Sequence, residues 1–259
     1  MGNLRKDHVA ERFVIVNTSQ TKTSKTKTSK TKTSKTSKNP FKPGNESMTN
    51  PSVLSLVLKD GMLQRLQDED DSDSVKNWAV RVVPAIDPAV DVETENSYSD
   101  HPLYSEPAYG YHYNVIASPD EKETLATISV EQWGYVLSVI QDRLRWLYTQ
   151  KGVAYVAIYA DSGKNSGAKV EHPHLHMMSF STIPPKIEEE ANSSHRILNE
   201  KGIYPMSQLV TSESGGPRQI LQTEGFIALS PWAPSHPYEF WICPKKHATS
   251  FSKISQKEI

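Results

Sequence analysis

Short runs of apolar and β-branched residues alternate with polar turns along most of the chain. Runs of this length predict strands, and their succession without intervening helices favours an antiparallel, strand-rich α+β fold over alternating βαβ units. We expect an antiparallel sheet, curved as a half-barrel, with flanking helices. The predicted strands are 12–17, 53–59, 78–83, 111–117, 153–160, 171–181, 219–222, 226–230 and 238–243.

One segment has the three- and four-residue apolar spacing of a long helix. Ser129 is a suitable N-cap, and Gln132 would complete a capping box with it. Lys151 and Gly152 predict the C-terminal end, as a cation and a left-handed cap. A second helix is predicted over 186–201. The apolar face of the long helix consists of Trp133, Val136, Leu137, Ile140, Leu144 and Leu147.

A weak internal repeat suggests two similar units. The strand 111–116 is followed by a proline, a charged turn and Ser129, and the strand 238–243 is followed by the same features and Ser255. The two serines lie 126 positions apart, and the chain ends at Ile259, soon after the second. We therefore predict an N-terminal unit over 1–185 and an incomplete second repeat over 186–259.

Charge is distributed unevenly although the net charge is only −1. A Lys/Thr/Ser tract over 21–38 holds seven lysines and no acid, and without it 22 basic residues face 30 acidic ones. The tract has no apolar residue to bury, so we predict a disordered insert at about 18–40. Because no arginine or aromatic residue is interleaved with the lysines, nucleic acid is an unlikely partner.

The remaining composition narrows the class of protein further. Cys243 is the one cysteine, which excludes an intrachain disulfide and any zinc site built on a cysteine pair. No secretory segment or apolar run of membrane-spanning length is present, so we expect a cytoplasmic protein. The acidic run 67–73 lacks the spacing and glycine of a calcium loop and is predicted to be a solvated hairpin tip.

Three histidines alternate in the segment 171–176, which is the densest chemical pattern in the chain. On a strand, His172, His174 and His176 would share one face. Three neighbouring imidazoles there could hold a metal or a phosphoryl group, and edge-strand surface histidines are the structural alternative. The preceding loop 161–169 offers backbone N–H groups and a lysine to an anion. His112 is predicted to be a half-buried structural residue.

This histidine strand and several other segments resemble the histidine triad superfamily, and more closely the galactose-1-phosphate uridylyltransferase family. The strongest match is the sequence Glu-His-Pro-His at 171–174. The other similar segments are 4–7 with 12–15, 39–46, 78–84 with 88–89, and 228–247.

The resemblance implies that His174 attacks the α-phosphorus of a UDP-sugar and that a uridylyl-histidine forms in a ping-pong reaction. A nucleotide sugar and a sugar 1-phosphate would be the substrates, in galactose metabolism, and Asp161, Gly167, Lys169 and His172 would bind them. His176 replaces a glutamine and is expected to be catalytic. The resemblance also suggests one alternative function, a nucleotide or dinucleotide hydrolase or phosphorylase. A catalytically impaired nucleotide-binding relic is another.

Several positions depart from the family pattern. The resemblance places the family's zinc ligands at Asn39, Lys42, Glu121 and His172. Only Glu121 and His172 remain as candidates, so we predict no structural zinc there, and the sequence identifies no other cofactor. Asp87 places a carboxylate near an expected phosphate. The incomplete second unit leaves a sheet edge uncovered, which favours a homodimer.

Overall fold

The computed structural model describes residues 2–7, 12–17, 38–70, 73–94, 99, 103–163, 165–255 and 257–258. Most of the predicted Lys/Thr/Ser insert lies outside these residues. The chain forms two compact units, 1–184 and 185–259, and their boundary is one residue from the predicted one. Among the described residues, every helix is too short or too polar to cross a membrane.

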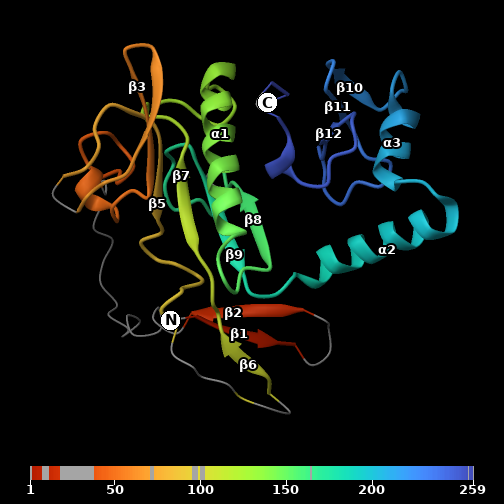
Figure 1. The fold of residues 1–259 in the computed structure, drawn as a ribbon, viewed down its shortest axis with the longest axis horizontal. Coiled ribbons are helices and arrows are strands. Elements are labelled where there is room, and N and C mark those ends of the chain that lie inside the picture. The colour runs from red at the N-terminus through yellow and green to blue at the C-terminus, as the bar shows by residue number, and fades with distance from the viewer. Residues whose placement is uncertain are drawn as a thin grey trace, which may run out of the picture. The chain divides into compact units, whose positions relative to one another are not determined.

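A six-stranded antiparallel sheet forms the centre of the first unit (Figure 1). Its interior is built from β-branched and apolar residues, of which Leu56, Val80, Val82 and Val115 are fully buried. The strand order is β4-β3-β5-β7-β9-β8. In chain order the strands are β3 (Leu54–Lys59), β4 (Met62–Leu66), β5 (Trp78–Pro84), β7 (His112–Ile116), β8 (Tyr155–Tyr159) and β9 (His174–Phe180).

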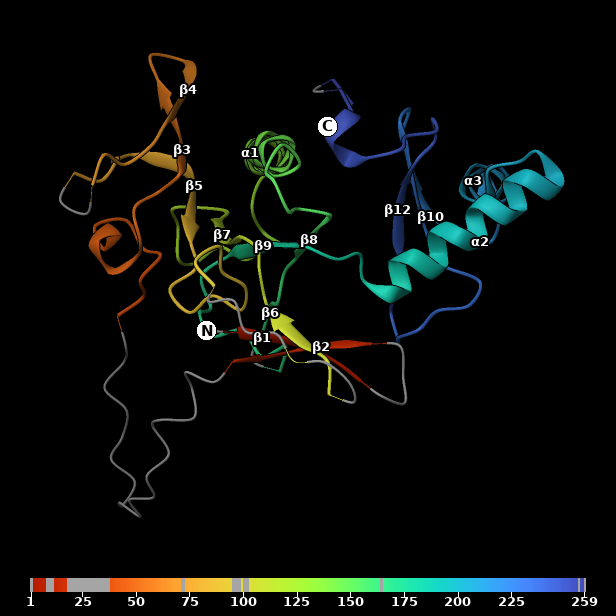
Figure 2. The same cartoon turned by 60° about the horizontal axis from the view of Figure 1, so that its bottom comes forward.

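The long helix α1 (Val130–Leu147) covers one face of this sheet (Figures 1 and 2). The Ser129 hydroxyl caps it by accepting the Gln132 N–H at 3.1 Å, as predicted. The capping box is incomplete, because the Gln132 side chain instead donates to the carbonyl oxygens of Ala79 and Ala117 at 2.8 and 2.6 Å. This amide therefore fastens the helix to the ends of two sheet strands.

A second, three-stranded sheet packs beside the first, with the order β2-β1-β6. Its strands are β1 (Gly2–Lys6), β2 (Phe13–Asn17) and β6 (Ser105–Pro107). Leu4 of β1 lies in an apolar cluster with Val90, Ala108 and Met178, so the small sheet is fixed against β9.

Asp68 forms a buried ion pair, although it lies in the run 67–73 that was predicted to be a solvated hairpin tip. Asp68 Oδ2 lies 2.6 Å from Arg81 Nη2 on β5, and both side chains are almost fully buried. The same carboxylate accepts the backbone N–H groups of Ser52 at 2.7 Å and Val75 at 2.9 Å. Burying a charge is unfavourable unless it is paired and hydrogen-bonded, and these contacts satisfy both conditions. The prediction is wrong for Asp68, which pairs with a residue of the sheet, whereas Glu69, Asp70 and Asp73 are exposed to solvent.

Glu46, in the 3-10 helix Glu46–Met48, is a second buried carboxylate of this region. Burial alone would raise its pKa. Hydrogen bonds from Lys76 Nζ at 2.7 Å, from the Trp78 indole and from the Gly44 N–H outweigh burial and lower the pKa of Glu46 to about 2. The segment 39–48 is thereby anchored to β5, and its Phe41 ring contacts the rings of His172 and His174.

The second unit contains two helices and a three-stranded antiparallel sheet of order β10-β11-β12. Cys243 is buried there with Val210, Ile227 and Leu229, as predicted. The last strand begins three residues later than predicted, at Trp241. The elements are α2 (Pro185–Lys201), α3 (Pro205–Glu213), β10 (Gln219–Gln222), β11 (Phe226–Leu229), β12 (Trp241–Pro244) and a 3-10 helix (Phe251–Lys253).

Candidate active site

The sheet face opposite α1 carries the chemical groups of the site. Tyr113 of β7 faces the helix, since its hydroxyl accepts a hydrogen bond from Arg143 of α1. Because strand residues alternate, His112, Asn114 and Ile116 face the other way. The register then sets Asn114 opposite His176 and Ile116 opposite His174.

A pocket of about 390 Å³ opens on this face. It brings together five of the residues that the sequence assigned to catalysis or substrate binding: Asp161, Gly167, Lys169, His174 and His176. His174 and Asp161 also border an adjoining pocket of about 340 Å³, which His172 lines. The loop 160–173 and the sheet face therefore meet around His174.

His174 is the first residue of β9, and its hydrogen bonding defines which ring nitrogen keeps a lone pair. Its Nδ1 lies 2.7 Å from the carbonyl oxygen of His172, so Nδ1 carries the proton and donates it to that oxygen. In the neutral ring, Nε2 then keeps its lone pair. Burial lowers the pKa of His174, which keeps the ring neutral at pH 7. The Phe41 ring packs edge-on against it, with 5.0 Å between the centroids.

His172 does not share the strand face of the other two histidines, contrary to the prediction. It precedes β9 and is buried, and its Nε2 donates to the carbonyl oxygen of Ser118 at 2.7 Å. Its Nδ1 accepts a hydrogen bond from Asn39 Nδ2 at 3.1 Å. The orientation of the Asn39 amide is defined, because its Oδ1 accepts the Phe41 N–H. Both nitrogens of His172 are therefore occupied by protein contacts, and its carbonyl orients His174.

The four positions at which the resemblance places zinc ligands lie close together but do not form a zinc site. Lys42 Nζ forms an ion pair with Glu121 Oε1 at 2.6 Å, while Asn39 bonds to His172. The hydrogen bond from Lys42 lowers the pKa of Glu121. Zinc needs about four N, S or O ligands, and this set has one histidine with both nitrogens occupied and one carboxylate paired with an ammonium group. No group of three metal-ligating side chains occurs in the described ranges.

The charged residues of the pocket partly neutralise one another. Lys169 Nζ lies 3.0 Å from Asp87 Oδ2, and both side chains are exposed to solvent. Asp161 follows β8 and borders both pockets. A bound anion would therefore compete with Asp87 for Lys169.

Three further pocket residues were missed by the sequence analysis. His112 is half-buried, as predicted, but its Nε2 lies 3.2 Å from His176 Nδ1. Tyr159, opposite His176 on β8, stacks on the His176 ring at 4.9 Å between the centroids. Asn114 is buried, and its Oδ1 has no hydrogen-bond partner among the described residues. Only the pairing of β7, β8 and β9, which local sequence patterns do not encode, brings these residues to His176.

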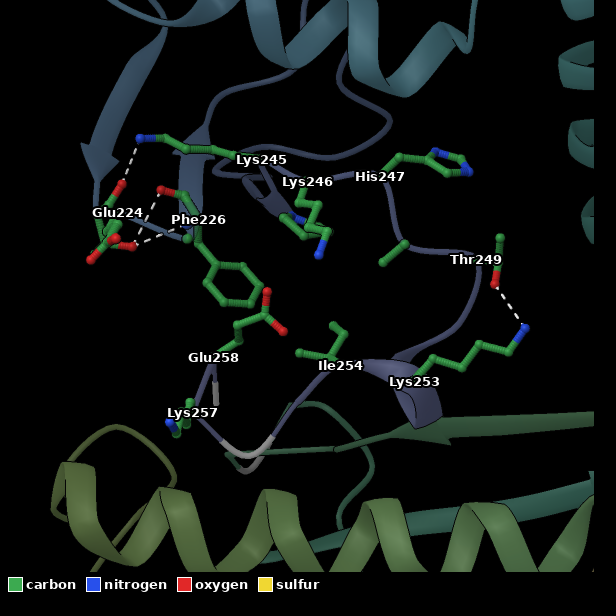
Figure 3. Close-up of a pocket in the computed structure, with 14 residues that line it drawn as sticks. Glu224, Phe226, Lys245, Lys246, His247, Thr249, Lys253, Ile254, Lys257 and Glu258 are labelled. Carbon is green, nitrogen blue, oxygen red and sulfur yellow. Dashed lines mark hydrogen bonds between the residues drawn. The ribbon is translucent and has the colours of Figure 1, made fainter.

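The second unit has a pocket of its own, of about 790 Å³ (Figure 3). Lys245 and Lys253 line it, but each ammonium group is hydrogen-bonded, to the Thr223 carbonyl oxygen and the Thr249 hydroxyl. Glu224 and Glu258 add negative charge to its wall. This pocket lacks the paired imidazoles of the first, so we place the candidate active site at His174.

The sequence is similar to two kinds of curated enzyme. It is 25% identical to ADP-glucose phosphorylase of Arabidopsis thaliana over 97% of the chain and spans 68% of that protein. It is 30% identical to galactose-1-phosphate uridylyltransferase of Thermotoga maritima over 61% of the chain, and this match spans 49% of that enzyme. The match to the Haemophilus influenzae uridylyltransferase, at 27% identity, spans 46%. No protein-family model matches the chain.

Solved structures are similar over the whole chain. A uridylyltransferase matches with a TM-score of 0.78 at 19% identity, and the match covers 70% of that structure. Arabidopsis thaliana ADP-glucose phosphorylase with bound ADP-glucose matches with a TM-score of 0.70 at 22% identity, with 73% covered. These matches confirm the predicted α+β fold with its antiparallel sheet.

Proposed function

We propose that this chain is a divergent relative of the galactose-1-phosphate uridylyltransferases and transfers a nucleotidyl group from a nucleotide sugar through His174. The observation that carries this proposal is the hydrogen bond from His174 Nδ1 to the His172 carbonyl oxygen. That bond leaves Nε2 as a neutral nucleophile in a pocket that a phosphate can enter. Imidazole is nucleophilic at neutral pH without a separate base.

The proposed reaction has two steps, the formation and the breakdown of a nucleotidyl-histidine. In the first, His174 Nε2 attacks the α-phosphorus, a P–N bond forms, and the bond to the bridging oxygen breaks. Sugar 1-phosphate leaves with the electron pair of that bond. In the second step an acceptor oxygen attacks the same phosphorus and the P–N bond breaks, which returns His174 to its neutral form. We propose a second hexose 1-phosphate as acceptor, and a cytoplasmic homodimer as the working form.

Transfer to inorganic phosphate is the second candidate function. The observation that favours it is the similarity to a plant ADP-glucose phosphorylase along 97% of the chain. The histidine at position 176 is compatible with a hexose 1-phosphate or inorganic phosphate as the acceptor. It is also compatible with water, and with water as acceptor the enzyme would be a hydrolase. The first step is the same in all three cases, so only the acceptor distinguishes them.

Product analysis tests these alternatives. The protein is incubated with UDP-glucose or ADP-glucose, and galactose 1-phosphate, inorganic phosphate or buffer alone is then added. A new nucleotide sugar indicates a transferase, a nucleoside diphosphate a phosphorylase, and a nucleoside monophosphate a hydrolase. Release of no glucose 1-phosphate from either donor would contradict all three and leave the nucleotide-binding relic.

Asn114 gives a prediction about substrate contact. Its unpartnered Oδ1 can accept a hydrogen bond from a substrate hydroxyl or N–H group, and burying it unpaired destabilises the free protein. Asn114→Leu is expected to stabilise the fold by about 1 kcal/mol and to raise KM for the nucleotide sugar by about tenfold. Thermal unfolding and steady-state kinetics measure the two effects. A less stable variant with an unchanged KM would contradict the assignment.

A further inference from the structure

His112 receives a hydrogen bond that determines where its own proton lies. The Ala89 backbone N–H lies 3.2 Å from His112 Nδ1. A backbone N–H can only donate, so Nδ1 must accept and carries no proton. In the neutral ring the proton of His112 is therefore on Nε2.

The same reasoning extends to His176. His112 Nε2 lies 3.2 Å from His176 Nδ1, so the His112 N–H donates and His176 Nδ1 accepts. Neutral His176 then carries its proton on Nε2. Its ring stacks on Tyr159 and makes a T-shaped contact with His174 at 5.0 Å between the centroids. A directed chain of hydrogen bonds thus runs from the Ala89 amide through two imidazoles to a pocket that both rings line.

The surroundings favour the neutral form of both rings. Burial, followed by the nearby His176 and Lys169, lowers the pKa of His112 to about 4, although Asp87 acts in the opposite direction. Burial, His174 and Lys169 also lower the pKa of His176, against Asp161. Protonating either ring nitrogen that now accepts a hydrogen bond would set two N–H donors against each other.

We propose that His112 is a positioning residue that makes His176 an uncharged Nε2–H donor to the oxygens of the phosphate attacked by His174. The inference rests on the proposed function of this pocket. It assigns different roles to the two pocket histidines: His174 offers a lone pair and His176 offers a proton in a hydrogen bond. Fixed donors at a transferring phosphoryl group stabilise charge without reorganising during the reaction. Because this donor is neutral, it adds no further positive charge to the pocket that holds the Lys169–Asp87 ion pair.

Two substitutions of similar size separate positioning from packing. His112→Gln keeps an N–H donor for His176 Nδ1, whereas His112→Glu replaces it with an acceptor that would draw the His176 proton to Nδ1. The Gln variant should form the nucleotidyl adduct at about a tenth of the wild-type rate or faster, and the Glu variant about 100-fold more slowly. The adduct rate of the Glu variant should also become pH-dependent, because the carboxylate favours the imidazolium form of His176. His195→Gln, on the exposed surface of α2, serves as the control and should change nothing.

Nitrogen-15 NMR of the histidine rings provides a readout that is independent of activity. We expect the Nε2–H tautomer of His176 in the wild type and the Gln variant, and Nδ1–H or imidazolium in the Glu variant. An Nδ1–H tautomer in the wild type, or equal rates for the Gln and Glu variants, would overturn the role of His112. If the wild type has the expected tautomer but forms no adduct from any nucleotide sugar, the proposed function fails while the His112–His176 geometry stands.

Discussion

Replacing His174 with alanine is expected to lower the rate of nucleotidyl transfer by on the order of 10⁴-fold or more, because the variant has no nucleophile. Neither of the two neighbouring histidines is expected to take its place. His172 has both nitrogens occupied, and His176 presents an N–H group rather than a lone pair. Single-turnover release of sugar 1-phosphate from a nucleotide sugar measures this loss.

His176→Ala is the matched comparison, because it removes an imidazole from the same strand but only one hydrogen-bond donor from the reaction. It should slow release by about 100-fold and leave the covalent intermediate detectable. The wild-type rate should also stay constant as the pH falls through 6.5, because burial lowers the pKa of His174 and keeps it neutral below that pH. A His174→Ala rate within tenfold of the wild type would contradict the nucleophile assignment.

Asp68→Asn is expected to lower the free energy of unfolding by about 3–5 kcal/mol, the largest effect that we predict on stability. Arg81 is only 1% exposed, and the substitution leaves its buried guanidinium group without a counter-charge. Chemical denaturation measures the loss. Glu69→Gln, an exposed neighbour in the same acidic run, is the control and should change stability by less than about 0.5 kcal/mol.

The pH dependence of stability gives a second test of this ion pair. Burial raises the pKa of Asp68, but hydrogen bonds from the Ser52 and Val75 N–H groups and from Arg81 outweigh it and lower the pKa below 3.8. A lowered carboxyl pKa stabilises the fold above pH 3.8 and loses that contribution as the pH falls below it. The wild type should therefore lose more stability on acidification than Asp68→Asn. Equal acid sensitivity would show that the pair is not ionised.

Local patterns were sufficient to predict elements whose residues interact with near neighbours. The spacing of apolar residues after Ser129 predicted α1, and β-branched runs predicted most strands of the large sheet. The partners of long-range polar groups could not be predicted in this way. Gln132 bonds to Ala79, and Asp68 pairs with Arg81, only after the strands have paired. A run of acidic residues predicts a solvated turn. The sequence does not reveal that the fold places a buried arginine beside one of these residues.

The candidate site was predicted in the same uneven manner. His174, His176, Asp161, Gly167 and Lys169 were identified from one contiguous segment and do line one pocket. His112 lies 64 residues before His176, and only the register of β7 on β9 brings the two rings together. Positions 39, 42, 121 and 172 were expected not to form a zinc site, with Glu121 and His172 as the two remaining candidate ligands. The hydrogen bond between Asn39 and His172 and the ion pair between Lys42 and Glu121 could not be predicted from the residue types.

Mapping the covalent intermediate tests the central claim most directly. The protein is incubated with UDP-glucose or ADP-glucose without an acceptor and quenched in alkali, which preserves a phosphoramidate bond. It is then digested for peptide mass spectrometry. We predict one nucleotidyl group on the peptide that contains β9, attached to His174. An adduct on another residue, or release of glucose 1-phosphate without any covalent intermediate, would contradict nucleophilic attack by His174.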